Sequence, residues 1–167
     1  NGSDGGPRLV TSGIWRDIDL VTWNGLKIDN VQYVQKDVTA AKANLSTVVR
    51  VNSDTDVADA TVTITAAGKP VATKKTPLVK GLNTVTLDYT IKKPRLWWTN
   101  GLGEPYLYGF SPSVKAGDDE VSQDEEIGIR SLRLITEADE HGRSLAFELN
   151  GKPVFMQGVD MIPLDSF

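Results

Sequence analysis

Strict alternation of apolar and polar residues, with helical periodicity nowhere sustained, is the feature that most limits what this chain can fold into. It is clearest in Leu82–Thr90, where Val85, Leu87 and Tyr89 alternate with threonine and aspartate side chains. Successive side chains of a strand point to opposite faces of a sheet, so the pattern predicts a strand with one buried face and one solvated face.

Two β-branched stretches, Leu45–Val51 and Ala60–Thr65, share that alternation and enclose the polar loop Asn52–Asp56. Their closeness in the sequence predicts that they pair as a hairpin. In the second stretch, Val62 and Ile64 are expected to point inward while the threonines face water, as in a sheet that is solvated on one side.

Turn residues separate the remaining predicted strands at short intervals. Ile14–Trp23 is expected to place Ile14, Ile18 and Leu20 on one side of a strand, which ends at the turn Asn24–Gly25. Other extended segments are expected at 28–33, at 106–114 and, after a turn at 117–119, at 120–133.

Around seven turn-separated strands over roughly a hundred residues are typical of an immunoglobulin-like antiparallel β-sandwich, an all-β fold. We predict this sandwich between about residues 24 and 133, with an extended, mobile N-terminal leader over 1–13 and a C-terminal β-hairpin. Its predicted core contains residues that share a face in the alternating strands: Val49, Val51, Val62, Ile64, Val85, Leu87, Tyr108 and Phe110.

The aromatic run Lys93–Tyr108 interrupts the alternation. Pro94 and Pro105 fix φ and lack N–H donors, so the run is neither one long strand nor a helix, and we interpret it as an extended crossover into a new strand. Trp97 and Trp98 each have a large area to bury. One is expected to enter a core while the other covers a rim or an interface.

A hairpin is predicted near the C-terminal end. Leu145, Phe147 and Leu149 alternate up to Asn150–Gly151, a strong two-residue hairpin signal, after which residues 154–156 return. The preceding residues 137–142 are interpreted as a charged loop. Several apolar side chains of the hairpin would be left uncovered, so it is expected to fold back on the sandwich or to pair with a second copy.

Length and composition limit the class of protein. At 167 residues the chain can form one domain and part of a second, but not a complete (β/α)8 barrel. No apolar run approaches the roughly 18 residues that predict a membrane span. The net charge of −4, with both signs scattered, lacks the basic stripe of a nucleic-acid-binding protein. The chain has no cysteine, and its first residues show no signal-peptide pattern.

The sequence offers no catalytic or metal-binding constellation. Glycoside hydrolysis needs two carboxylates about 5–10 Å apart, and the acidic runs Asp118–Glu120 and Asp124–Glu126 are better interpreted as solvated loop and strand-edge charges. A Ser-His-Asp triad would depend on His141, the only histidine, which lies in a polar loop. Because no ligand pattern for zinc or calcium is present, we predict no metal and no cofactor.

Three stretches resemble the β-mannosidase-like branch of glycoside hydrolase family 2. Leu96–Tyr108 is similar to that branch's signature Leu-Trp-Trp-Pro-Asn-Gly-x-Gly, later followed by Leu-Tyr, with Thr99 in place of the proline. Thr11–Arg16 resembles the segment that closes a jelly-roll domain. Gly128–Arg130, followed by Phe147–Phe155, resembles the segment that leads into a (β/α)8 barrel.

The resemblance implies three parts: a leader and the exit strand of a jelly-roll sugar-binding domain over 1–23, the immunoglobulin-like sandwich over 24–133, and the truncated start of a catalytic barrel over 134–167. The implied parent is a glycosidase that acts on a β-linked sugar, with its catalytic glutamates beyond Phe167. This chain would be non-catalytic and would hold the neighbouring jelly-roll and barrel domains together. The family suggests a periplasmic or extracellular location.

Candidate site residues follow from the same resemblance. Asp4 aligns with an aspartate that lines the family's sugar subsite, although Ser3 and Gly5 replace its flanking tryptophans. Asp160 stands in place of an asparagine in a segment that contributes to the active-site rim. Three tryptophans are expected to pack between domains: Trp15, Trp97 and Trp98.

Two alternative functions stay open. A free-standing carbohydrate-binding or adhesion sandwich would use exposed tryptophans as a sugar platform. A family member that acts on β-glucosaminides or β-galactosides would carry the same sandwich, because the fold does not specify the sugar.

Overall fold

The strands of this protein lie between Leu26 and Val154 in a computed structural model that describes residues 12–161. The chain divides into two units, Trp23–Phe155 and a smaller one that combines Asn1–Thr22 with Met156–Phe167. No helix occurs among the described residues, and therefore none that could cross a membrane.

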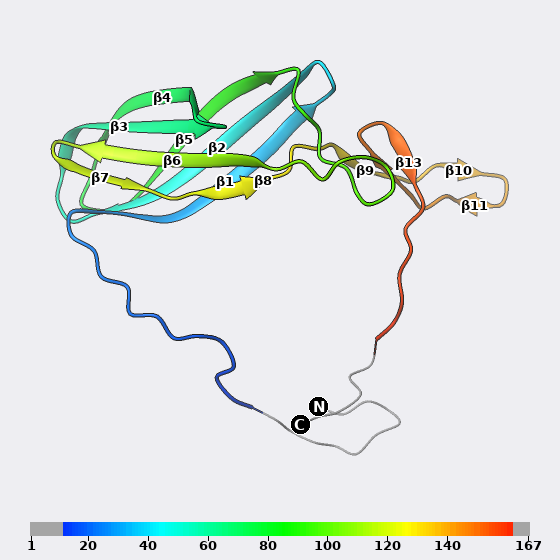
Figure 1. The fold of residues 1–167 in the computed structure, drawn as a ribbon, viewed down its shortest axis with the longest axis horizontal. Coiled ribbons are helices and arrows are strands. Elements are labelled where there is room, and N and C mark those ends of the chain that lie inside the picture. The colour runs from blue at the N-terminus through cyan, green and yellow to red at the C-terminus, as the bar shows by residue number, and fades with distance from the viewer. Residues whose placement is uncertain (1–11, 162–167) are drawn as a thin grey trace. The chain divides into compact units, whose positions relative to one another are not determined.

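The first sheet of the larger unit consists of three long antiparallel strands. β1 (Leu26–Val38) and β5 (Gly81–Lys92) flank β2 (Lys42–Ser53) in the order β1-β2-β5 (Figure 1). β2 and β5 pair in one continuous register, whereas β1 carries two register shifts. The predicted inner face of β5 is confirmed, since Val85, Leu87 and Tyr89 are all buried.

The second sheet has the order β4-β3-β6-β7 and is also antiparallel. Its strands are β3 (Val57–Ala66), β4 (Lys69–Leu78), β6 (Tyr108–Ala116) and β7 (Asp119–Ser122), and β8 (Glu125–Ile127) also pairs with β6. As predicted, Val62 and Ile64 of β3 are buried between partly exposed threonines.

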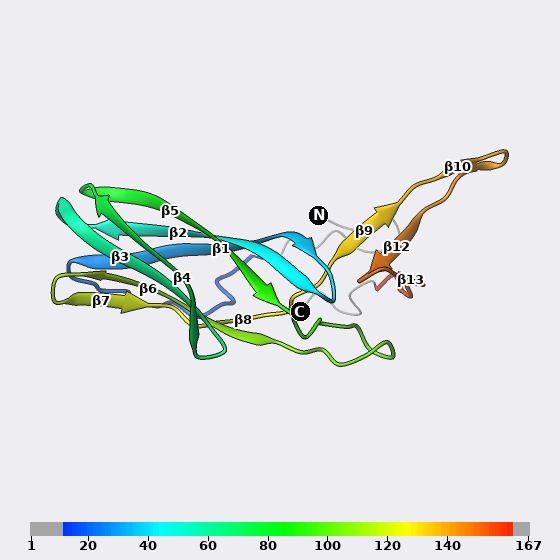
Figure 2. The ribbon, with the colours of Figure 1, turned by 90° about the horizontal axis from the view of Figure 1, so that it is seen from above.

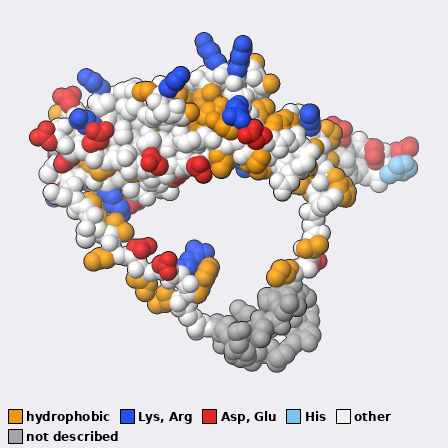
Figure 3. Space-filling model, viewed as in Figure 1, with side chains coloured by type: hydrophobic (Ala, Val, Ile, Leu, Met, Phe, Trp, Pro, Cys, Tyr) orange, Lys and Arg blue, Asp and Glu red, His pale blue; other side chains and the backbone are white. Residues whose placement is uncertain are grey.

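β4 is a strand that the alternation does not predict. It contains Pro70 and Pro77 and no regular apolar spacing. Such a sequence is compatible with an edge strand, where a missing N–H costs nothing and lysines discourage pairing with another chain. Figure 3 shows Lys and Arg side chains projecting from the edge of the sandwich where β4 lies.

β2 and β3 lie in different sheets, so the predicted hairpin of 45–51 with 60–65 is wrong. The intervening loop carries two carboxylates that bond to backbone elsewhere instead of closing a tight turn. Asp54 accepts a hydrogen bond from the N–H of Gly25 at 3.1 Å, and Asp56 accepts one from the N–H of Lys80 at 2.7 Å. The chain therefore crosses from one sheet to the other, and both strands contribute their apolar faces to one core.

The core lies between the two sheets, and the fold is the predicted immunoglobulin-like antiparallel β-sandwich. Every predicted core residue is buried except Tyr108, which is half-buried at the start of β6. The Tyr108 ring makes an edge contact with Tyr106, with centroids 5.0 Å apart, and lies 6.3 Å from Phe110. Phe110 is 1% exposed and also packs against Tyr33 at 5.0 Å.

The segment 120–133 is not the single strand that was predicted. It divides into β7, β8 and, in another sheet, β9 (Leu132–Ile135). The first break lies opposite Pro112 of β6, which has no N–H to donate, and only the N–H of Gln123 bonds across it, to the Pro112 carbonyl at 3.1 Å. The second break is the crossing at 128–131.

The predicted strand Ile14–Trp23 is also wrong, because the described part of this segment pairs with no other strand. Ile14, Ile18 and Leu20 are 80–92% exposed. Alternation gives a segment the right side chains for a sheet, but an isolated strand cannot satisfy its backbone groups without a neighbour. Residues 1–11, which include most of the predicted leader, lie outside the described part of the chain.

A small sheet follows the sandwich. β9, β12 (Ala146–Leu149) and β13 (Lys152–Val154) have the order β13-β12-β9, and both views place them at one end of the long strands (Figures 1 and 2). The predicted turn at Asn150–Gly151 is confirmed by φ values of +51° and +78°. The predicted charged loop 137–142 is instead a short hairpin of β10 (Ala138–Asp139) and β11 (Gly142–Arg143).

Candidate functional site

The aromatic crossover, residues 93–107, connects β5 to β6 and folds back on itself. Trp97 and Pro105 form an isolated antiparallel bridge, and the N–H of Trp98 donates to the Glu104 carbonyl at 3.0 Å. Gly101, with φ of +81°, lies in the turn between these two arms. The run is thus neither one strand nor a helix, and its backbone holds the two indole rings in place.

Two glycines make room for the two tryptophan rings. A Cβ atom on Gly103 would lie 2.7 Å from Cγ of Trp98, and one on Gly128 would lie 2.7 Å from Cγ of Trp97. No real Cβ approaches another carbon so closely, so each ring rests directly on backbone. The second glycine of the Asn-Gly-x-Gly signature therefore has a packing reason that its place in the sequence does not reveal.

Arg95 fixes the arms of the crossover to the start of β6. Its N–H donates to the Tyr108 hydroxyl at 2.9 Å, and its guanidinium lies 3.8 Å from the centre of the Tyr106 ring. The same guanidinium donates to the Glu104 carboxylate at 2.6 Å, and this hydrogen bond raises the pKa of Arg95 above its already high value. The Arg95 and Glu104 side chains are exposed, so their ion pair contributes more to local order than to stability.

The junction, residues 128–131, joins β8 to β9 and is clamped by the side chain of Gln35 from β1. The Gln35 amide donates to the Gly128 carbonyl at 2.9 Å and accepts from the N–H of Arg130 at 2.8 Å. Between them, Ile129 is fully buried and its carbonyl accepts from the N–H of Trp97 at 2.8 Å. Nothing in the sequence pattern singles out Gln35, because its partners lie 93 and 95 residues away.

Asn150 forms a second amide clamp at the turn of the small sheet. Its side-chain oxygen accepts from the N–H of Ser131 at 2.9 Å, and its side-chain nitrogen donates to the Trp97 carbonyl at 2.9 Å. Its own N–H donates to the Ser131 carbonyl at 2.9 Å. One residue of a hairpin turn thus binds both the junction and the aromatic crossover, so the small sheet is tied to the sandwich.

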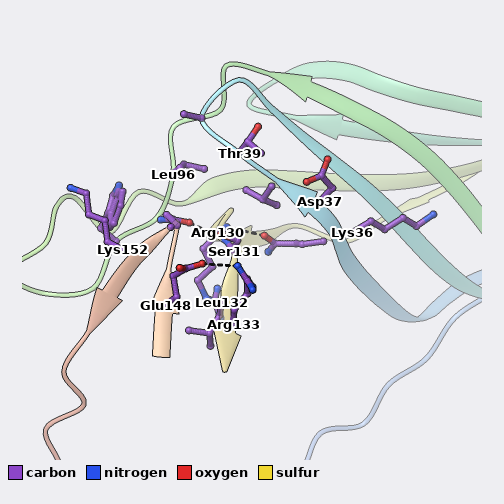
Figure 4. A pocket seen from close by; sticks show the side chains of 16 residues that line it. Lys36, Asp37, Thr39, Leu96, Arg130, Ser131, Leu132, Arg133, Glu148 and Lys152 are labelled. Atoms are coloured by element: carbon purple, nitrogen blue, oxygen red, sulfur yellow. Dashed lines mark hydrogen bonds and ion pairs between the residues drawn. The ribbon is translucent and has the colours of Figure 1, made fainter. Parts of the chain in front are cut away.

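A groove of about 610 Å³ lies between the end of β1, the crossover and the small sheet (Figure 4). Its apolar lining includes Leu96, Trp98 and Leu132. Its polar lining includes the two clamping amides and six charged side chains: Lys36, Asp37, Arg130, Arg133, Glu148 and Lys152. The Nζ of Lys152 lies 5.0 Å from the centre of the Trp98 ring, and Arg130 lies 5.1 Å from that of Trp97.

The predicted site residues differ in burial and lie in different parts of the chain. Trp97 and Trp98 are half-buried in the crossover, and no contact with another domain tests their predicted role. Trp15, in the smaller unit, is 81% exposed. Asp160 is exposed, and Asp4 lies outside the described residues. Their roles therefore stay predictions.

The described titratable groups do not assemble a reaction centre. His141 lies on the exposed β10–β11 turn, 3.3 Å from the neighbouring Glu140. Among residues 12–161, no three His, Cys, Asp or Glu side chains come together to hold a metal ion. Burial raises the pKa values of Tyr33 and Tyr89, and both face the core.

The fold is an immunoglobulin-like β-sandwich that continues through an amide-clamped junction into a small sheet. The family model for glycosyl hydrolases family 2 matches residues 26–130. The chain belongs to this family.

Known proteins are similar over nearly the whole chain. It is 37% identical over 168 residues to β-mannosidase B of Aspergillus flavus and 33% identical over 168 residues to that of Aspergillus niger. Each alignment covers 99% of this chain and 20% of the relative. The chain thus spans about a fifth of the length of the curated relatives it matches.

Solved structures show the same fold. The β-D-mannosidase of Dictyoglomus thermophilum matches with a TM-score of 0.74 at 28% identity, over 86% of this chain and 18% of that one. The exo-chitosanase of Amycolatopsis orientalis matches with a TM-score of 0.69 at 24% identity, over 83% of this chain and 16% of that one, which shows likeness of fold alone.

Proposed function

We propose that this chain is the non-catalytic immunoglobulin-like part of a larger β-mannosidase-like glycoside hydrolase. In this proposal, residues 1–23 end a jelly-roll sugar-binding domain, 24–133 form the sandwich, and 134–167 begin a catalytic (β/α)8 barrel. The domain's role is to keep a sugar-binding surface in register with the mouth of the barrel. The names of the relatives and the one-fifth share of their length support this assignment.

The observation that carries the proposal is the pair of amide clamps. Gln35 fixes the junction to the first sheet, and Asn150 fixes the small sheet to the junction and the crossover. A flexible linker would have no need of such long-range hydrogen bonds. A rigid connection between domains matters for catalysis because a displacement of about 1 Å at a reacting centre can cost on the order of 100-fold in rate.

The small sheet presents an apolar row to whatever follows it. Leu134, Phe147 and Val154 are paired in register across the three strands, and Leu134 is 54% exposed. We assign this row to contact with the catalytic domain and, in the isolated chain, to pairing with a second copy. The turn end of the hairpin folds back on the sandwich, since Leu149 is 3% exposed there. The open end does not, since Phe155 is 84% exposed.

Hydrolysis assays test the proposal. The 167-residue chain should not turn over aryl β-mannosides, whereas the full-length parent should, and aryl β-glucosaminides and β-galactosides distinguish the sugars. In the parent, Asn150→Gly should lower kcat/KM, while Asn83→Ala, which removes a local amide clamp in β5, should not. Turnover by the isolated chain, or no turnover of any of the three substrates by the parent, contradicts the proposal.

A second candidate function, carbohydrate binding, is supported by Trp15, which is 81% exposed. Arg16 lies over one face of its ring, 4.5 Å from the centre, so the other face is the one that could stack on a sugar. Mannan or manno-oligosaccharides would then quench tryptophan fluorescence, and Trp15→Ala would abolish the effect. Unchanged fluorescence at saturating sugar excludes this candidate without touching the first.

A further inference from the structure

In the groove between the sandwich and the small sheet, the carboxylates have ion-pair partners among the described residues whereas two of the cations do not. Both of its carboxylates are engaged within the chain: Asp37 lies 3.6 Å from Lys42, and Glu148 lies 3.1 Å from Arg133. Lys36 pairs outside the groove, with Asp88 at 2.6 Å. The groove therefore offers no free carboxylate to an incoming cation.

Arg130 and Lys152, in contrast, have no carboxylate within 4.0 Å in the described part of the chain. Each lies over an indole ring of the crossover, Arg130 over Trp97 and Lys152 over Trp98. Arg130 makes one weak hydrogen bond, to the Gly128 carbonyl at 3.3 Å. A ring face holds a cation in position without using its N–H donors, so these donors are available to a ligand.

The two side-chain amides of the groove are already occupied. Both ends of the Gln35 amide and both ends of the Asn150 amide bond to backbone within the junction and crossover. A neutral sugar needs acceptors as well as donors for its hydroxyl groups, and here the amides are used for structure. Apart from the Ser131 hydroxyl, the side-chain groups left for a ligand are donors with positive charge, which favour a carboxylate-bearing occupant.

We propose that this groove docks an acidic chain segment, with at least two carboxylates and one apolar side chain, from another domain of the parent protein. This inference rests on the proposed function, because it names the partner of the same connecting domain. Figure 4 shows Lys152 and Arg130 at separate positions along the groove. Cations spread in this way suit successive carboxylates along an extended chain, and Leu96, Trp98 and Leu132 provide the apolar floor.

The test is an NMR titration of the 167-residue chain with an acetylated hexapeptide, Glu-Leu-Glu-Glu-Leu-Glu, observing the indole N–H of Trp98 and the backbone amides of the junction. The peptide should shift these signals, and raising the ionic strength should weaken the binding. Arg130→Gln combined with Lys152→Gln should raise Kd roughly threefold or more. Lys74→Gln combined with Lys75→Gln is the matched control on β4 and should leave Kd unchanged.

Each remaining outcome overturns the inference. In the first two, the peptide with Gln in place of Glu binds as tightly as the acidic peptide, or acetate at the same carboxylate concentration gives equal shifts. In the other two, the double variants have equal Kd values, or the shifts are confined to β4. Lys152→Gln alone changes an exposed strand and leaves the junction intact, so it controls for disturbance of the junction. It should give part of the loss of affinity. Because no turnover is measured, failure here leaves the assignment to a glycosidase untouched.

Discussion

Replacing Asn150 should loosen the small sheet without unfolding the sandwich. Asn150→Gly removes the two side-chain hydrogen bonds, to the Ser131 N–H and the Trp97 carbonyl, and keeps the backbone bond to Ser131. Glycine also accepts the left-handed φ of +51° at this position. The change therefore isolates the contribution of the amide from that of the backbone.

The expected magnitude follows from the two bonds. A net contribution of about 0.5–1.5 kcal/mol each gives about 1–3 kcal/mol in the free energy of opening of the small sheet. That corresponds to roughly a 5- to 150-fold loss of protection. Asn150→Ala should cost more, because a Cβ in the left-handed region adds roughly 1–2 kcal/mol.

Amide hydrogen exchange resolved by residue measures this directly. Protection should fall in β9, β12 and β13, while amides in β2 and β5 keep their rates. Asn83→Ala is the control, since its amide bonds both to the N–H and to the carbonyl of Val79 but closes only a local loop. A uniform loss across both sheets would show that the clamp supports global stability. Unchanged exchange in β9, β12 and β13 would show that the Asn150 clamp does not stabilise the small sheet. Either result refutes the reasoning.

The remaining predictions concern packing and pH. Gly128→Ala should lower the free energy of unfolding by about 1–3 kcal/mol, because the added Cβ would meet the Trp97 ring. Gly109→Ala, which meets nothing within 4 Å, should stay within about 0.5 kcal/mol in the same denaturant melts. Burial, assisted by the charge of Glu125, raises the pKa of Tyr33, so its contribution to stability is intact below the unfolded pKa of about 10 and is lost as pH rises above it. Tyr33→Phe should flatten this loss of stability at alkaline pH. It should also raise the free energy of unfolding at pH 7 by about 1 kcal/mol, because the buried hydroxyl has no hydrogen-bond partner among the described residues. A lower melting temperature of the variant at pH 7 would contradict this.

The sequence by itself determined the class of fold. In β5 and β3 the alternation of apolar residues with threonine is a local property of the strand, and it identified the buried faces correctly. The Asn150–Gly151 turn was equally local, since its left-handed φ values follow from residue type. The signature around the paired tryptophans identified the family, because adjacent aromatics, an Asn-Gly turn and a second glycine rarely occur together by chance.

Only the tertiary structure decided which strands are neighbours. The closeness of 45–51 and 60–65 in the sequence favoured a hairpin, but Asp54 and Asp56 bond to distant backbone and send the chain to the other sheet. β4 gave no signal, because an edge strand has little to bury. Alternation alone could not make a strand of 14–23, since pairing needs a partner as well as a pattern.

In the candidate site, too, some residues could be identified from the sequence and others only from the tertiary structure, but for a different physical reason. The tryptophans were visible in the sequence because large aromatic side chains are rare and their burial is valuable. The residues that hold them were not, because Gln35 and Asn150 act through amide groups whose partners lie 19 to 95 residues away. Hydrogen bonds between distant segments depend on the position of the backbone, and that position exists only once the two sheets have packed.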